Sequence, residues 1–100
     1  MFVRMHDEQV ETAAFEYFKG IVFKPLEMGE KSWIAGGCLR EWLLEKRLNK
    51  SVDIDVWCAD DAERQRLDEA AKKAGWTEKK SSPTSSNWKS KSGHWVQFIR

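Results

Sequence analysis

The chain has 100 residues, with 17 Lys and Arg against 16 Asp and Glu, and a formal net charge of +1. This length supports one modest hydrophobic core, which excludes a large multidomain enzyme. A content of 41% hydrophobic and 33% charged residues is typical of a folded globular domain and excludes disordered and collagen-like chains. We therefore expect a single domain over residues 1–100.

No segment has the pattern of an export signal or a membrane span. Charged residues follow the N-terminus before an apolar run can form, and no apolar run approaches the roughly 18–20 residues that a membrane span needs. Two cysteines, Cys38 and Cys58, are too few for a disulfide framework and are interpreted as buried, reduced thiols. The expected location is cytoplasmic, without a membrane partner.

The first third of the chain contains a helical pattern followed by a strand pattern. Apolar residues at three- and four-residue spacing predict an amphipathic helix over residues 7–19, which ends near Gly20. The segment 21–31 contains proline and glycine and is predicted to be a connection. A short apolar run then predicts a buried strand over residues 32–35.

The glycine pair Gly36-Gly37 stops this strand, and the periodicity changes. Apolar residues at helical spacing predict a helix over residues 38–49. Hydrophobic residues then alternate with acids over residues 52–58, which predicts a strand. Because the side-chain period of a strand is two, Asp53 and Asp55 are expected on one face of it.

The second half of the chain predicts one helix and three strands. Asp60 and Glu63 have the spacing of a capping box and begin a predicted helix over residues 61–74, with Gly75 as its C-cap. The strands, of which the last two form a hairpin, are predicted over residues 76–80, 87–91 and 94–99. This order of elements predicts an α+β fold, a small mixed sheet with helices packed against it.

Charge is distributed unevenly along the chain. Residues 1–78 carry 12 basic and 16 acidic side chains, whereas the rest of the chain has no acid. Its basic residues are interpreted either as a binding surface for phosphate or nucleic acid, or as lysines that prevent a sheet edge from pairing with another chain. Trp88 and Trp95 lie beside them and are interpreted either as base-stacking groups or as core residues. The five basic residues are Lys79, Lys80, Lys89, Lys91 and Arg100.

The glycine pair and the two acids form the candidate site. Gly36 and Gly37 stand where a strand turns into a helix, so a ligand can approach the backbone, and the helix N-terminus offers free amides and partial positive charge. Asp53 and Asp55 project to one face at roughly 6–7 Å spacing, and such oxygens bind Mg²⁺ together with substrate phosphates. We expect these parts to bind a magnesium-bound nucleoside triphosphate such as ATP.

Two segments also resemble a known family signature. Trp33-Ile34-Ala35-Gly36-Gly37-Cys38-Leu39-Arg40-Glu41-Trp42-Leu43-Leu44, followed by Val52-Asp53-Ile54-Asp55-Val56, is similar to the head domain of the nucleotidyltransferase superfamily. The closest branch is that of poly(A) polymerases and tRNA CCA-adding enzymes, with the short phage-type proteins that share its motif. The likeness covers residues 32–59, and the later elements in outline.

The resemblance implies a polymerase beta-like palm and a nucleotidyl transfer reaction. In the family, a hydroxyl attacks the α-phosphate of the nucleotide in a two-metal displacement, and pyrophosphate leaves. Asp53 and Asp55 would be the catalytic acids and would ligate two Mg²⁺ ions. Gly36, Gly37 and Arg40 would bind the triphosphate.

The sequence departs from the family pattern in ways that leave two interpretations open. Glu41 stands where the motif usually has Asp, and no acid follows Glu78 to supply the third carboxylate, for which the terminal strand offers Trp95 and Gln97. The second metal would then be poorly held. The chain is either a truncated enzyme, whose next strand carries the acid, or a catalytically inactive module that binds nucleotide, nucleic acid or protein.

Two further expectations concern partners. A variant of the enzyme interpretation is a minimal nucleotidyltransferase that modifies a partner toxin, although the motif of such proteins usually begins Gly-Ser. The apolar terminal strand is expected to present an exposed edge, through which two copies of the chain would pair as a dimer.

Overall fold

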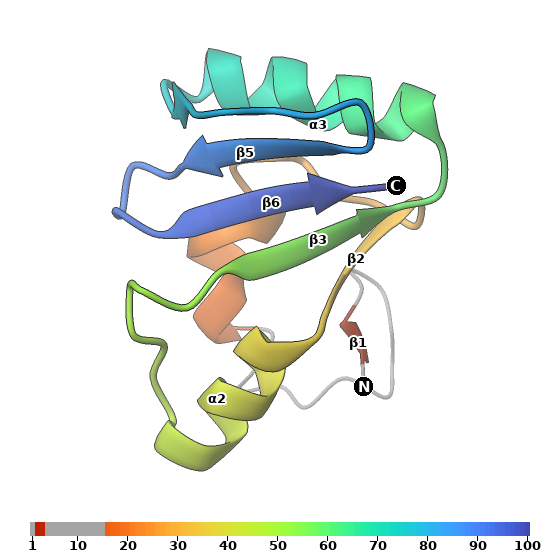
Figure 1. Ribbon diagram of the computed structural model, residues 1–100. Coiled ribbons are helices and arrows are strands. Elements are labelled where there is room, and N and C mark those ends of the chain that lie inside the picture. The colour runs from red at the N-terminus through yellow and green to blue at the C-terminus, as the bar shows by residue number, and fades with distance from the viewer. Residues whose placement is uncertain (1, 4–15) are drawn as a thin grey trace.

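The computed structural model describes residues 2–3 and 16–100 and shows a mixed six-stranded sheet with helical elements packed against it (Figure 1). The predicted α+β class is confirmed. The strands are β1 (Phe2–Val3), β2 (Ser32–Ala35), β3 (Ile54–Cys58), β4 (Thr77–Glu78), β5 (Ser85–Lys89) and β6 (Trp95–Ile99). The helical elements are the π-helical turn η1 (Lys19–Phe23) and the α-helices α2 (Gly37–Glu45) and α3 (Asp61–Lys73). No helix of the described residues is long and apolar enough to cross a membrane.

The strand order is β1-β2-β3-β6-β5-β4, so the last strand of the chain lies inside the sheet. Strand β6 pairs in parallel with β3 on one side and antiparallel with β5 on the other. The expectation of a free terminal edge for dimer pairing is therefore wrong. The reason is that the crossover through α3, β4 and β5 returns the chain to the side of β3 that β2 leaves free, where β3 covers one hydrogen-bonding edge of β6 and β5 covers the other.

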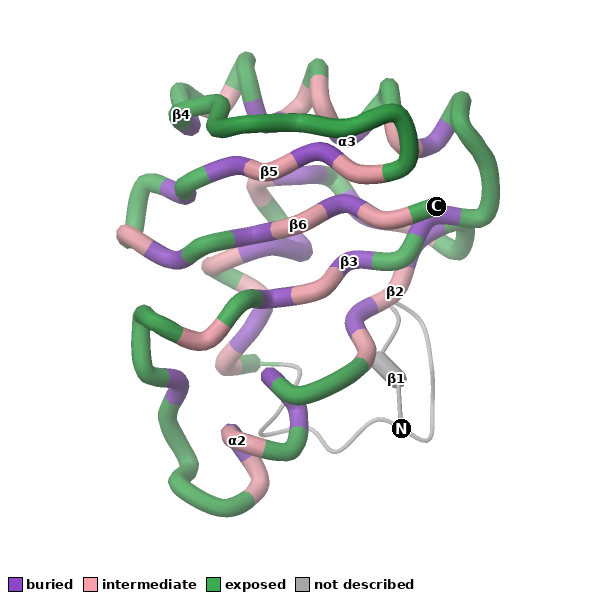
Figure 2. Tube along the Cα trace, in the orientation of Figure 1, coloured by how far each residue is buried: buried purple, intermediate pink, exposed green. Residues whose placement is uncertain are grey.

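The two faces of the sheet differ in burial. Even-numbered side chains of the central strands, such as Ile34, Val56 and Phe98, are fully buried together with Phe18 and Leu67 from the helical layer. Odd-numbered positions of the same strands are only partly buried or exposed, and the alternation is visible along β3 and β6 (Figure 2). No described helix covers this odd-numbered face, which we call the open face.

The N-terminal helical segment extends past the glycine at which it was expected to end. Most of the predicted helix over residues 7–19 lies outside the described residues, but residues 16–18 are helical. The helical turn then continues through Gly20 as η1, with the Lys24 N–H donating to the Lys19 carbonyl at 2.9 Å. Burial of Val22 and Phe23 explains the continuation, because it outweighs the cost of about 1 kcal/mol for one helical glycine.

Helix α2 ends at Glu45, four residues before its predicted end. Lys46 adopts a left-handed conformation with φ 58°, and its N–H donates to the Trp42 carbonyl at 2.7 Å. Leu48 is nevertheless buried, because its backbone N–H donates to Tyr17 Oη at 2.7 Å and the loop folds inward. Leu48, whose spacing predicted a place on the helix, therefore lies in a packed loop.

The later elements lie close to their predicted positions. Helix α3 begins as expected, with Asp60 Oδ1 accepting from the Glu63 N–H at 2.8 Å. The Glu63 carboxylate accepts two hydrogen bonds from Arg66, at 2.7 and 3.0 Å. The second hydrogen bond of a capping box, from the Asp60 N–H to the Glu63 side chain, therefore does not form. Strand β2 has its predicted bounds, whereas β3 begins at Ile54, β4 is shorter than predicted, and β5 is displaced two residues toward the N-terminus.

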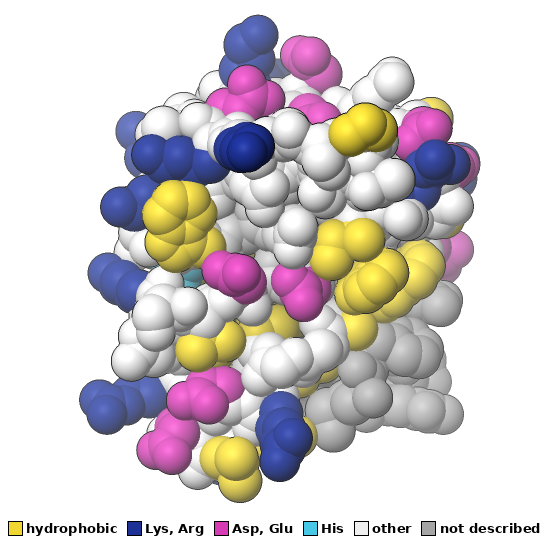
Figure 3. Space-filling view, in the orientation of Figure 1, with side chains coloured by type: hydrophobic (Ala, Val, Ile, Leu, Met, Phe, Trp, Pro, Cys, Tyr) yellow, Lys and Arg dark blue, Asp and Glu magenta, His cyan; other side chains and the backbone are white. Residues whose placement is uncertain are grey.

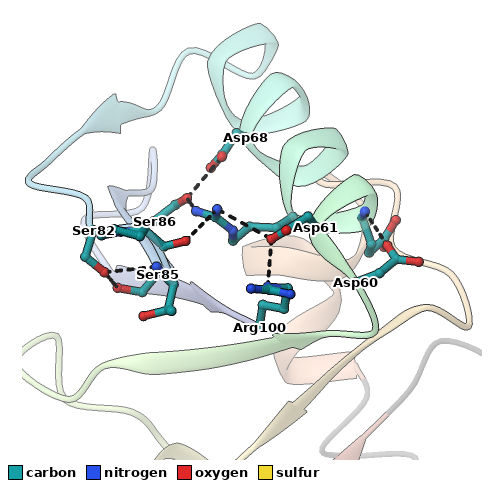
Figure 4. A network of polar contacts seen from close by, with 11 residues as sticks. Asp60, Asp61, Asp68, Ser82, Ser85, Ser86 and Arg100 are labelled. Carbon is teal, nitrogen blue, oxygen red and sulfur yellow. Dashed lines mark hydrogen bonds and ion pairs between the residues drawn. The ribbon is translucent and has the colours of Figure 1, made fainter.

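A polar network fastens the C-terminal hairpin to α3 (Figure 4). Asp68 accepts from Ser86 Oγ at 3.0 Å and from the Trp88 indole N–H at 2.8 Å. Arg64 donates to Ser86 Oγ at 3.1 Å, and Arg100 pairs with Asp61 at 2.7 Å. Arg100 therefore serves the fold, because it ties the end of β6 to the first turn of α3.

Candidate functional site

A row of side chains crosses the open face from β2 to β5. The register pairs Ala35 with Asp55, Asp55 with Gln97, and Gln97 with Asn87. Asp53 directly precedes β3 and has the same parity as Asp55, so both acids lie on this face, as the alternation predicted. In the space-filling view, acidic side chains lie near the centre of the face between hydrophobic groups (Figure 3).

The structure brings one glycine of the pair, Gly36, next to one of the acids, Asp55, at one end of this row. Gly36 precedes α2 with φ 97° and ψ −154°, a conformation that is essentially restricted to glycine. A Cβ added at Gly36 would lie 3.3 Å from Asp55 Oδ2, so the Asp55 carboxylate lies against this backbone. Gly37 is the first residue of α2, and no side chain of the described residues caps the N-terminus of this helix. Arg40 is exposed within α2.

The negative charges of Asp53 and Asp55 repel each other. Burial raises the pKa of Asp55, and the charge of Asp53 raises it further. Neither acid takes part in an ion pair with another described residue. A cation bound at this point would neutralise the pair and lower the Asp55 pKa again.

Asp53 and Asp55 are the described side chains of this site that suit a divalent cation. No group of three or more His, Cys, Asp and Glu side chains that could hold a metal occurs among the described residues. Gln97 stands beside Asp55 in the register, on the strand for which the third carboxylate was expected. Its amide oxygen is a neutral ligand, so it adds coordination without adding charge.

A second feature of the open face begins at Asp53. A groove of about 400 Å³ is lined by polar and aromatic side chains, and Trp95 is 37% exposed at its side. The Nζ atoms of Lys79 and Lys89 lie 5.6 and 5.8 Å from the Trp95 ring centroid. The lining residues are Asp53, Lys79, Lys80, Asn87, Trp95, Val96 and Gln97.

The predicted basic footprint is smaller in the structure than in the sequence. Arg100 pairs with Asp61, and the Lys91 side chain lies against Gly75 at the end of α3. Trp88 is buried and hydrogen-bonded to Asp68, so of the two candidate stacking groups only Trp95 is exposed. Asn87 was not identified as a site residue from the sequence. The signal that could have found it is its pairing across the predicted hairpin with Gln97, which lies on the same face of the sheet as Trp95.

The thiols and the buried histidine have packing roles. Both cysteines are buried and free. Burial raises the pKa of Cys38 to about 11 and that of Cys58 to about 12, so both stay protonated near neutral pH. His94 is buried, and its Nδ1 lies 2.7 Å from Ser92 Oγ.

A scan against protein-family models, a search of curated proteins and a search of solved structures each gave no match to this chain.

Proposed function

We propose that the chain is a nucleotidyltransferase-fold domain with a polymerase beta-like palm, which binds a magnesium-bound nucleoside triphosphate and transfers its nucleotidyl group. The observation that carries the proposal is the contact between the Gly36 backbone and the Asp55 carboxylate. An uncapped helix N-terminus favours phosphate, whereas a carboxylate beside it repels phosphate. A divalent cation that bridges carboxylate and phosphate resolves this conflict.

Each residue of the motif has a part in this proposal. The amides at Gly36 and Gly37 hold the phosphates, and Asp53 and Asp55 provide oxygen ligands to the cation. Arg40, exposed within α2, is free to approach the triphosphate from the helix side. When bound, Mg²⁺ ions stabilise the entering and leaving oxygens of an in-line displacement.

A second candidate function is a catalytically inactive member of the same fold that binds nucleotide, nucleic acid or a protein partner. The observation that favours it is Gln97 at the register position beside Asp55. Two carboxylates and a neutral amide support one bound cation better than two, because the second cation lacks charged ligands. Binding and catalysis are therefore tested separately.

Calorimetric titration of the chain with ATP, with Mg²⁺ and with EDTA, tests the binding step. We expect binding that requires Mg²⁺ and is lost when Asp53→Asn and Asp55→Asn are combined. The matched control, Glu45→Gln with Glu69→Gln, removes two exposed acids elsewhere and should bind as the wild type does. Binding that persists in EDTA, or in the aspartate double variant, would contradict the proposed site.

The raised Asp55 pKa gives the titration a pH signature. Because protons compete with the cation, affinity for Mg–ATP should fall as the pH is lowered through the Asp55 pKa. In the apo protein the same shift means that ionised Asp55 lowers stability, since the folded state binds its proton more tightly than the unfolded state. The aspartate double variant should therefore unfold at or above the wild-type temperature, and loss of its fold would assign the acids a structural role.

Pyrophosphate release then separates the enzyme from the inactive module. The assay combines the chain with Mg–ATP and a single-stranded oligonucleotide as acceptor. Release that depends on Asp53 and Asp55 favours the transferase, whereas Mg–ATP binding without release across nucleotides and acceptors favours the module.

A further inference from the structure

Trp95 differs in its surroundings from the buried tryptophans of this chain. It is 37% exposed on β6, whereas Trp42, Trp76 and Trp88 are buried in the core. Two lysine ammonium groups lie within 6 Å of its ring centroid, close enough for a cation–π attraction. An exposed aromatic ring beside lysine side chains is an arrangement with which proteins bind a base and its adjoining phosphates.

The charge around Trp95 is concentrated rather than spread. Lys79, Lys80 and Lys89 come from β5 and the segment after β4, and all three lie at the groove or at the Trp95 ring. Figure 3 shows basic side chains gathered at this side of the open face, next to a large hydrophobic group. Three lysines on neighbouring segments suit a chain of phosphates better than a single one.

The groove also has groups that contact a base edge. Asn87 and Gln97 face each other across β5 and β6. The Asn87 amide nitrogen donates to the Lys80 carbonyl at 2.5 Å, which leaves its oxygen and second N–H for a ligand, and the Gln97 amide offers donors and an acceptor. The volume of the groove, about 400 Å³, lies within the range of small-ligand sites. A base can enter such a groove and stack on Trp95 only when it is unpaired.

From these observations we infer that this groove, lined by Lys79, Lys80, Asn87, Trp95 and Gln97 and flanked by Lys89, binds single-stranded nucleic acid. One unpaired base stacks on Trp95 and displaces the ammonium groups of Lys79 and Lys89 from over the ring. The edge of the base then meets the two amides, and the displaced lysines contact the adjoining phosphates. The inference needs neither Mg²⁺ nor the glycine pair. Asp53 also lines the groove and repels phosphate in the absence of metal, so its removal should tighten the binding of nucleic acid.

Fluorescence anisotropy with a labelled oligothymidylate of about 12 nucleotides, in EDTA, tests the groove. Trp95→Ala should weaken binding roughly 5- to 150-fold, the loss of one stacked base. Trp57→Ala is the matched control, because Trp57 is 38% exposed on the same face but outside the groove, and it should leave the affinity unchanged.

Salt dependence tests the lysines. Combining Lys79→Gln with Lys89→Gln should reduce the slope of log K against log salt by about 1.4, or 0.7 for each phosphate contact to a single strand. Lys72→Gln with Lys73→Gln removes the same charge from exposed positions of α3 and should keep the slope. Each variant is checked for a wild-type circular dichroism melt.

The inference is overturned by any of three results. These are equal affinity for a duplex of the same length, equal affinity for polyglutamate, and wild-type affinity in both the Trp95 and the paired lysine variants. Asp53→Asn separates this inference from the proposed function, because it should abolish Mg–ATP binding yet tighten oligothymidylate binding in EDTA. If Mg–ATP binding fails while the oligonucleotide still binds through Trp95, the groove stands and the proposed function falls.

Discussion

At the scale of single residues, the two glycines of the motif have different tasks. Gly36 has φ 97° and ψ −154°, a region that costs other residues on the order of 1–3 kcal/mol. Gly37 begins α2, and a Cβ added there would meet no atom within 4 Å. The first glycine is thus required by backbone geometry and by the approach of Asp55, whereas the second leaves space above the helix N-terminus.

Gly36→Ala and Gly37→Ala should therefore have opposite effects on stability. We expect Gly36→Ala to lower the free energy of unfolding by about 1–3 kcal/mol, because of backbone strain and the 3.3 Å contact with Asp55 Oδ2. Gly37→Ala should be neutral or raise it by up to about 1 kcal/mol, since alanine favours the helix. Urea denaturation of both variants measures the difference, and equal losses would mean that the positive φ of Gly36 is not a constraint.

At the scale of elements, Asp68 makes two of the polar contacts that join α3 to the hairpin. Asp68 accepts from the Ser86 hydroxyl on β5 (Figure 4) and from the indole N–H of Trp88. Both donor residues, Ser86 and Trp88, are buried. Helix α3 has a mostly charged sequence, so this polar contact supplements the apolar contribution of Leu67 and Ala71.

Asp68→Ala should destabilise the domain by about 1–3 kcal/mol, because it leaves buried donors without their acceptor. The change should appear in urea denaturation followed by tryptophan fluorescence, which reports the altered surroundings of Trp88. Glu69→Ala is the control, as Glu69 is the exposed neighbour on the same helix, and it should shift the free energy by no more than about 0.5 kcal/mol. If Asp68→Ala lowers the free energy of unfolding no more than the control does, the Asp68 contacts do not stabilise the junction.

At the scale of the whole molecule, the sequence predicts local patterns better than long-range pairing. Alternation over residues 52–58 correctly places Asp53 and Asp55 on one face, because a period of two is a property of the strand itself. The position of β6 between β3 and β5 depends on pairing across the fold, which no local pattern encodes. The sequence likewise groups Arg100 with the other basic residues of the C-terminal segment, because its ion pair with Asp61 is a long-range contact.

Tertiary packing also overrides local signals at element ends. Gly20 and the apolar Leu48 are ordinary markers of a helix end and a helical face, yet the helical turn passes through the first and a packed loop contains the second. The candidate site was more predictable than these ends, because strand, glycine pair, helix and acid strand are contiguous in the chain. The groove at Trp95 combines Asp53, which precedes β3, with residues of β5, β6 and the segment after β4, so its composition follows only from the pairing of the strands.

Gln97 is the neutral residue beside Asp55 in the row of side chains that crosses the open face. Gln97 neighbours Asp55 in the parallel register, so Gln97→Asp places a third carboxylate on the open face beside the pair. We expect the variant to bind Mg²⁺ about tenfold more tightly, because charged ligands raise cation affinity, and to be less stable in EDTA, because three acids repel one another. Calorimetry measures the first effect and thermal unfolding the second.

Asn87→Asp is the matched control for this change. Asn87 lies one strand further along the same row, next to Gln97 and not to Asp55, so its carboxylate adds the same charge at a greater distance from the metal site. A gain in Mg²⁺ affinity for Gln97→Asp alone would identify the row through Asp55 as the coordination site, and new pyrophosphate release would identify the missing carboxylate as what separates binding from catalysis. Equal gains in both variants would mean that Mg²⁺ responds only to net charge, and the proposed coordination at Asp53 and Asp55 would be wrong.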